Sequence, residues 1–123
     1  MAKDNPTSIS LNNTIDFPRF NDQEVLSVKW LYTVKSSNPI YADGYRWLLL
    51  GSFNWEQARG LPKDVNKISD ESYVYLGSYN IINKSVLLTY REKAVTIKEY
   101  IDSSDIPTNR TRIYDNGGAQ VYR

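Results

Sequence analysis

The densest apolar run of the chain extends from Tyr41 to Trp55, and it constrains the fold more than any other stretch. After the turn signal Asp43-Gly44, apolar side chains alternate onto both faces of an extended segment. A buried helix is the rival interpretation, because the period of a short apolar run does not separate the two structures. Flanking glycines and a high aromatic content favour a strand. We therefore expect residues 45–53 to form the central strand of a β-sheet, either covered on both sides or at a subunit contact.

A short helix is expected directly after this strand, near residues 54–60. Asn54 can act as its N-cap, with Gln57 three residues later as in a capping box. Gly60 offers a left-handed C-cap, and Pro62 then stops the helix. A helix of about one and a half turns is marginal alone, so we expect the packing of Trp55 to hold it.

Alternating apolar and polar residues predict further strands before and after this run. The clearest alternation extends from Val25 to Lys35 and is typical of a half-buried antiparallel strand. Asn116-Gly117 near the C-terminus supplies the positive φ angles that a tight hairpin turn needs. The further strands are expected at residues 25–35, 73–82, 85–91, 94–101, 111–114 and 119–122.

About seven or eight short strands with turns every ten or so residues are typical of a sandwich or barrel. We therefore predict an all-β fold, an antiparallel sandwich or barrel with one short helix near residues 54–60. A chain of 123 residues fits one domain. Residues 1–7 are polar and contain Pro6, so we expect an N-terminal arm followed by a single β-domain at residues 8–123.

The composition excludes several kinds of chemistry. The chain has no Cys and no His, so it lacks thiolate sites, disulfides, the commonest metal ligand and the usual general base. A net charge of +1 and a pI of about 7.9 give no electrostatic footprint for nucleic acid. No apolar run reaches the roughly 18 residues of a membrane span, and the N-terminus has no apolar signal region. We expect a protein without a membrane segment, located in the cytoplasm or inside an assembled particle.

Acidic side chains are the remaining candidates for metal binding or catalysis. Asp102 with Asp105, or Asp70 with Glu71, could hold a hard cation, but loop carboxylates usually bond their own backbone. A carboxylate pair for glycoside cleavage would come from Asp43, Glu56, Glu92 and Glu99, and nothing in the sequence brings two of these together. Nucleophile elbows, phosphate loops and dinucleotide fingerprints are absent. We therefore predict no enzyme activity, no metal and no cofactor.

Two functional classes remain. The first is a structural or assembly protein that docks to copies of itself or to a larger complex such as a viral or phage particle. Ten tyrosines suit half-buried sheet faces and interfaces. The candidate interface is the tyrosine stripe of the strand predicted at residues 73–82, formed by Tyr73, Tyr75 and Tyr79.

The alternative is a module that binds a small ligand, a carbohydrate first and a nucleotide second. Arg110 and Arg112 project to one face of a predicted strand, and with Tyr114 and Tyr122 they could grip a phosphate or stack on a base. An edge strand protected by charge is the competing interpretation of these arginines. Trp30, Trp47 and Trp55 could stack on sugar rings if they point outward. A ligand module predicts that exposed aromatic side chains gather in one concave patch with convergent polar groups.

Overall fold

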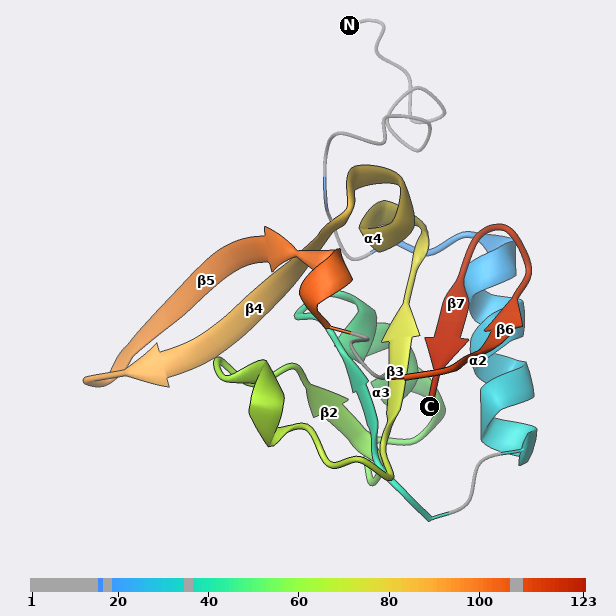
Figure 1. Cartoon of the computed structure of the whole chain (residues 1–123), viewed down its shortest axis with the longest axis horizontal. Helices are drawn as coiled ribbons and strands as arrows, with labels where there is room; N and C mark the ends of the chain where they lie inside the picture. Colours follow the sequence, from blue (N-terminus) through green and yellow to red (C-terminus); the bar gives the residue numbers. More distant parts are fainter. Residues whose placement is uncertain (1–15, 17–18, 35–36, 107–109) are drawn as a thin grey trace, which may run out of the picture.

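The computed structural model describes Asp16 and residues 19–34, 37–106 and 110–123. It shows a mixed sheet, helices and a long two-stranded ribbon that projects from the body (Figure 1). The arm expected at residues 1–7 lies outside the described residues. In chain order the elements are α2 (Asp22–Val34), β1 (Ile40–Ala42), α3 (Arg46–Phe53), β2 (Ala58–Gly60), η1 (Val65–Lys67), β3 (Tyr73–Leu76), α4 (Ser78–Asn83), β4 (Ser85–Glu92), β5 (Val95–Asp102), η2 (Ser103–Asp105), β6 (Arg112–Asp115) and β7 (Gln120–Tyr122).

The main sheet has the strand order β2-β1-β3-β7-β6. Strand β1 runs parallel to both β2 and β3, whereas β7 is antiparallel to β3 and β6. Parallel neighbours cannot be joined by a tight hairpin and need a crossover, usually a helix. Helix α3 is that crossover between β1 and β2, which places it against the sheet.

Two apolar clusters cover the two faces of the sheet. Helices α2 and α3 pack on one face, where the buried side chains are Val28, Leu31, Ile40, Ala42, Leu49, Leu50, Ala58, Tyr73, Tyr75, Ala119 and Val121. The base of the ribbon and the short η1 and η2 turns cover the other face, with Leu61, Ile68, Val74, Leu76, Val86, Leu88 and Ile106 buried. Both faces are therefore closed, as parallel strands require.

The all-β prediction is wrong, and so is the sandwich or barrel, because two predicted strands are helices. The segment expected as a strand at residues 25–35 lies largely in α2, whose buried residues are Glu24, Ser27, Val28 and Leu31. These four positions follow the i, i+3, i+4, i+7 spacing of a helix face. Two of these four residues are polar, so the apolar residues alone do not show the helical period. Their chance alternation in the sequence predicted a strand instead.

The central strand predicted at residues 45–53 is helix α3, the rival interpretation of the apolar run. The residue that marks the start of this helix in the sequence is Asp43. Its Oδ1 accepts hydrogen bonds from the backbone N–H groups of Tyr45 at 3.2 Å and Arg46 at 2.9 Å. A carboxylate in this position satisfies orphan donors at a helix start. The helix predicted near residues 54–60 is wrong as well, because Asn54 is the C-cap of α3 and strand β2 follows.

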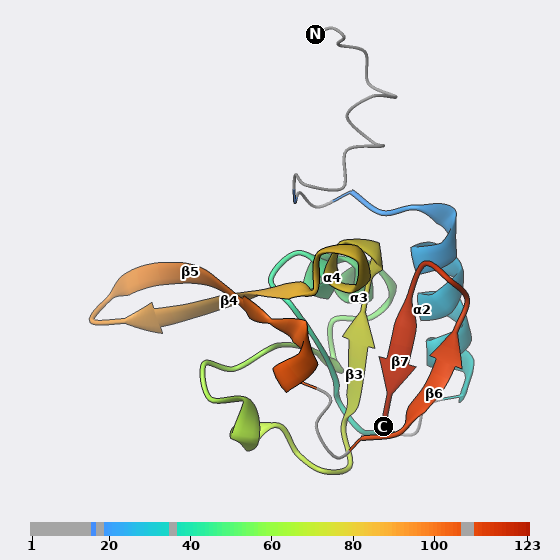
Figure 2. The same cartoon turned by 45° about the horizontal axis from the view of Figure 1, so that its top comes forward.

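The strand predicted at residues 73–82 is correct only in its first half, because it ends at Leu76 and α4 begins at Ser78. The predicted C-terminal hairpin is confirmed, and so are the strands predicted at residues 85–91 and 94–101. The pattern also predicted residues 85–91 as the hairpin partner of residues 73–82, and this is wrong, because β3 pairs with β1 and β7 and helix α4 separates it from β4. Strands β4 and β5 pair from Ser85↔Asp102 to Glu92↔Val95, and β6 pairs with β7 around the turn at Gly117, which has a φ of 88°. Figure 2 shows that the β4–β5 ribbon stands clear of the sheet and helices.

Candidate functional site

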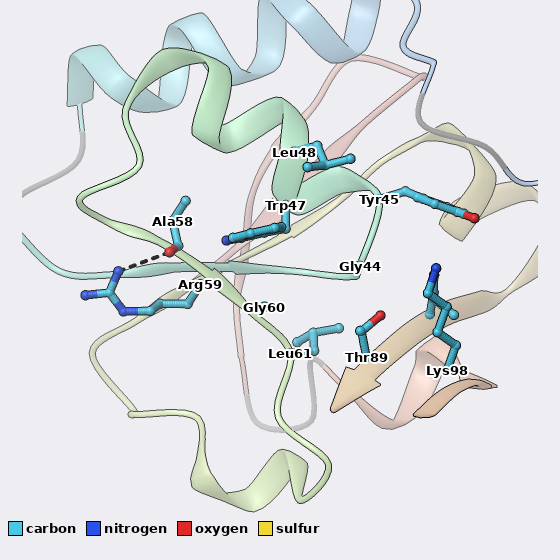
Figure 3. Close-up of a pocket in the computed structure, with 11 residues that line it drawn as sticks. Gly44, Tyr45, Trp47, Leu48, Ala58, Arg59, Gly60, Leu61, Thr89 and Lys98 are labelled. Atoms are coloured by element: carbon cyan, nitrogen blue, oxygen red, sulfur yellow. Dashed lines mark hydrogen bonds between the residues drawn. The ribbon is translucent and has the colours of Figure 1, made fainter. Parts of the chain in front are cut away.

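A cavity of about 530 Å³ lies between the start of α3, the end of β2 and the base of the β4–β5 ribbon (Figure 3). The lining is mainly apolar, and it comes from three segments that are distant in the sequence. The lining residues are Gly44, Tyr45, Trp47, Leu48, Ala58, Arg59, Gly60, Leu61, Leu87, Thr89 and Lys98.

The indole of Trp47 forms one wall of the cavity, and Trp55 supports it from behind. The two ring centroids are 4.7 Å apart, with the planes inclined at 59°. Trp55 lies over Gly51, where an added Cβ would stand 2.1 Å from the indole Cζ3. Because Gly51 leaves this space, the two indoles pack together and hold the wall in place.

The ribbon forms the opposite wall, and Gly44 permits its close approach. The Gly44 N–H donates to the carbonyl of Leu87 at 2.9 Å, and a Cβ on Gly44 would lie 2.5 Å from Thr89 Oγ1. Thr89 and Lys98 face the cavity from the ribbon, and the Lys98 ammonium is 5.8 Å from the centroid of the Tyr45 ring (Figure 3). This wall therefore carries a hydroxyl and a cation.

Strand β2 forms a third side of the cavity, and it contributes backbone groups there rather than a charged side chain. The guanidinium of Arg59 is turned away, because its Nη1 donates to the carbonyls of Glu56 at 2.8 Å and Ala58 at 3.0 Å (Figure 3). Gly60 is different. Its neighbours Arg59 and Leu61 bond to β1 in the parallel ladder, so the N–H and C=O of Gly60 face the free sheet edge.

A buried ion pair fixes the loop that carries this site. Asp43 and Arg46 are almost fully buried, with Arg46 Nε 2.9 Å from Asp43 Oδ1. Asp43 Oδ2 also accepts from Asn80 Nδ2 at 2.8 Å and from the Leu87 N–H at 3.1 Å. Burial alone would lower the pKa of Arg46, but the carboxylates of Asp43, Asp16 and Glu24 together outweigh it and raise that pKa. Arg46 stays charged and holds the Asp43 carboxylate, which ties the end of β1 to α4 and to the ribbon.

Asp16 and Glu24 extend this buried network. The Asp16 carboxylate accepts from Arg46 Nη2 at 2.6 Å and from the Tyr100 hydroxyl at 2.8 Å. Glu24 accepts from the N–H groups of Asn21 and Ser78, each at 3.2 Å. Burial raises the pKa of Asp16 and that of Glu24. The carboxylates are enclosed and hydrogen-bonded, so their arrangement supports the fold and offers no open site for chemistry.

The structure places the candidate interface tyrosines mostly inside the molecule. Tyr73 is 3% exposed and Tyr75 is 0% exposed, so neither presents its side chain to a partner. Tyr79 is half-buried on α4, with its ring centroid 6.0 Å from that of Tyr100. The three tyrosines do not form an exposed stripe, because the strand that was to carry them ends at Leu76.

The four candidate ligand-binding residues are not brought together. Arg110 donates to the carbonyls of Ser72 at 2.6 Å and Ser69 at 2.7 Å. Arg112 pairs with Asp115 at 3.4 Å. Tyr114 stacks on Trp30 with centroids 4.4 Å apart, and Tyr122 packs against the second apolar cluster. These side chains serve the C-terminal hairpin and its surroundings.

The acidic candidates have local partners. Asp102 Oδ1 accepts from the N–H and hydroxyl of Ser104, and the Glu99 carboxylate accepts from the Tyr90 hydroxyl at 2.9 Å. Within the described ranges, no group of three or more acidic side chains is arranged to hold a metal ion. Sequence analysis named Trp47 as a candidate but missed Gly44, Thr89 and Lys98. The Asp43-Gly44 turn was the only signal that pointed toward this place.

Comparisons with known proteins add one relationship. No curated protein and no solved structure matches the chain. Over the part of the chain that the structure describes, none of the helices has the length and apolar character needed to cross a bilayer. The model of a family described as predicted membrane protein, DUF2206, matches residues 1–122, and the chain therefore belongs to that family.

Proposed function

We propose that this domain is a non-enzymatic binding module that receives a saccharide ring in the Trp47 cavity. The observation that carries the proposal is the aromatic wall of Trp47 and Tyr45 opposite the polar groups of the ribbon. Sugar rings present C–H faces that pack on aromatic rings, while their hydroxyls need nearby donors and acceptors.

The dimensions and chemistry of the cavity support a small ligand. A volume of about 530 Å³ lies within the range of roughly 300–1,000 Å³ that is usual for small-molecule sites. Leu48, Leu61 and Leu87 supply apolar contact, and Thr89 supplies a hydroxyl. The N–H and C=O of Gly60 add a donor and an acceptor at the free edge of β2. Few polar groups in a mainly apolar cleft give orientation as well as affinity.

Membership in a family described as predicted membrane protein bears on the location of the site. We propose that the described part of the chain lies in the aqueous phase beside a membrane. The buried apolar side chains Val28, Leu31, Leu49 and Leu50 of α2 and α3 pack in the cluster that covers the sheet, which supports this location. The cavity would then meet ligands in water or at the membrane surface.

The test is a titration followed by two-dimensional amide NMR with a panel of neutral and charged monosaccharides. The decisive variant is Gly60→Leu, because Gly60 lines the cavity and a Cβ there meets no atom within 4 Å, so we expect the larger side chain to occupy part of the cavity. We expect a saccharide to shift resonances around Trp47 in the native chain and not in Gly60→Leu. Trp30→Phe is the matched control, since Trp30 stacks on Tyr114 elsewhere. Absence of binding by every saccharide would contradict the proposal.

Self-assembly is a second candidate, and exposed apolar side chains of α3 and its C-terminal loop favour it. Leu48 and Phe53 are each 38% exposed and Trp55 is 52% exposed. Docking of a second copy through this surface predicts growth of the native mass with concentration in light scattering. Phe53→Lys should abolish that growth, whereas Ile113→Lys on β6 should not. A monomer at all concentrations would exclude self-assembly.

A further inference from the structure

Beyond its base, the β4–β5 ribbon separates its charges between its two faces. Directly paired residues in an antiparallel ladder share a face, and successive pairs alternate. One face therefore carries the pairs Leu87↔Tyr100, Thr89↔Lys98 and Arg91↔Thr96. The opposite face carries Leu88↔Glu99, Tyr90↔Ile97 and Glu92↔Val95.

The first of these faces continues the wall of the cavity. Thr89 and Lys98 line the cavity itself, and Arg91 and Thr96 follow two residues farther out. The Arg91 guanidinium is held at the tip, where it donates to the carbonyl of Ala94 at 3.0 Å and to Thr96 Oγ1 at 3.5 Å. A strip of two cations and two hydroxyls thus leads outward from the aromatic wall.

The acidic residues of the ribbon do not neutralise this strip. Glu92 lies on the opposite face and pairs with Lys63 at 2.8 Å, and Glu99 on that face accepts from Tyr90. Asp102 lies on the same face as the strip but at the base of the ribbon, where its Oδ1 accepts from the N–H and hydroxyl of Ser104. Within the described chain no ion pair joins Lys98 or Arg91 to a carboxylate. The cavity lining contains no acidic side chain either. The two cations are therefore available to a bound anion.

We propose that the ligand of the Trp47 cavity is an anionic saccharide, whose ring packs on Trp47 and whose acidic group meets Lys98. This inference rests on the proposed function. The recognised chemistry is an oxyanion, which a sugar carries either as a carboxylate or as a phosphate. Hydrogen bonds from a cation to an oxyanion are about twice as strong as neutral ones, so the charge decides which sugars bind.

The length of this strip of cations and hydroxyls also determines how large a saccharide must be to contact both cations. Two residues of strand span about 7 Å, so Arg91 lies that much farther from the cavity than Lys98. This additional distance along the ribbon is comparable to the size of one sugar ring. A monosaccharide in the cavity reaches Lys98, and a disaccharide with an acidic outer unit reaches Arg91 as well.

The test compares four probes by isothermal titration calorimetry: glucose, glucuronate, glucose 6-phosphate and inorganic phosphate. We expect glucuronate or glucose 6-phosphate to bind at least about tenfold more tightly than glucose. The preferred one of the two identifies the acidic group. Raising the salt concentration should reduce this preference. Lys98→Gln should remove most of this preference for the acidic sugars, whereas Lys29→Gln on α2 should have no effect on it.

The outcomes separate the two proposals. Equal binding of glucose and the acidic sugars, with no effect of Lys98→Gln, would overturn the anionic ligand and leave the saccharide site standing. Binding of inorganic phosphate as tightly as glucose 6-phosphate, unchanged in Gly60→Leu, would overturn the packing of a ring on Trp47. Failure of all three sugars would overturn both proposals.

Discussion

Trp55 packs on Trp47 across Gly51, and the 4.7 Å between the ring centroids fixes the aromatic wall of the cavity. Gly51→Ala therefore separates the two indoles, because the new Cβ would occupy the place of the Trp55 ring. Trp55 is half exposed and can move, and Ala favours the helix by about 1 kcal/mol over Gly. We expect the near-UV circular dichroism of the indole pair to be lost with little change in stability. An unchanged spectrum would contradict this packing.

Arg46→Met should be among the most destabilising single substitutions in the chain. It leaves the carboxylates of Asp43 and Asp16 buried without their cation. Removing one partner of a buried pair costs about 3–5 kcal/mol, which urea denaturation measures directly. Arg112→Met removes an exposed pair and should cost less than about 1 kcal/mol. Similar losses for the two variants would show that the buried network does not hold the fold.

Gly44→Ala should loosen the ribbon from the body, and Thr89→Ala should restore part of the loss. A Cβ on Gly44 would lie 2.5 Å from Thr89 Oγ1 and 3.1 Å from Leu87 Cδ2. We expect the single variant to lose about 1–3 kcal/mol of stability, as in other overpacked sites. The double variant should recover a measurable part, because residues in contact are energetically coupled. Strict additivity of the two changes would contradict the close approach.

The stability of the domain should depend on the ionisation of Glu24. Burial raises the pKa of Glu24 above the 4.5 of a free side chain, so the folded state binds its proton more tightly than the unfolded state. The contribution of Glu24 to stability is therefore fully present below pH 4.5 and is lost as the pH rises through the folded pKa.

Glu24→Gln removes this contribution. Each unit of pKa shift corresponds to about 1.4 kcal/mol, so the variant should lose less stability than the native chain between acidic and neutral pH. Urea denaturation across that range measures the difference. Asp16 changes stability in the same direction and remains in both proteins. Parallel curves for the two proteins would contradict an effect of Glu24.

The C-terminal hairpin and the two strands of the ribbon could be predicted from the sequence because their causes are local. Asn116-Gly117 supplies the backbone conformation of the C-terminal turn, and β4 and β5 are joined by a turn of two residues. Helices α2 and α3 could not be predicted in this way. Their buried faces include Glu24, Ser27 and Arg46, and these polar residues are acceptable inside only because partners from other elements reach them.

The residues that line the cavity could not be predicted from the sequence for a related reason. Arg110 resembles a ligand-binding residue until the fold brings the carbonyls of Ser69 and Ser72 to its guanidinium. Conversely, Lys98 is an ordinary strand residue until the ribbon places it opposite Trp47. Such sites depend on contacts between distant segments, and alternation within a strand does not encode which segment lies opposite.

The most direct measurement is of nuclear Overhauser effects between the C–H protons of a bound saccharide and the aromatic protons of the domain. We expect effects to Trp47 and Tyr45, with none to Trp30, which packs on Tyr114 away from the cavity. Effects to Trp30 or Tyr114 without any to Trp47 would contradict the account and move the binding site to the C-terminal hairpin.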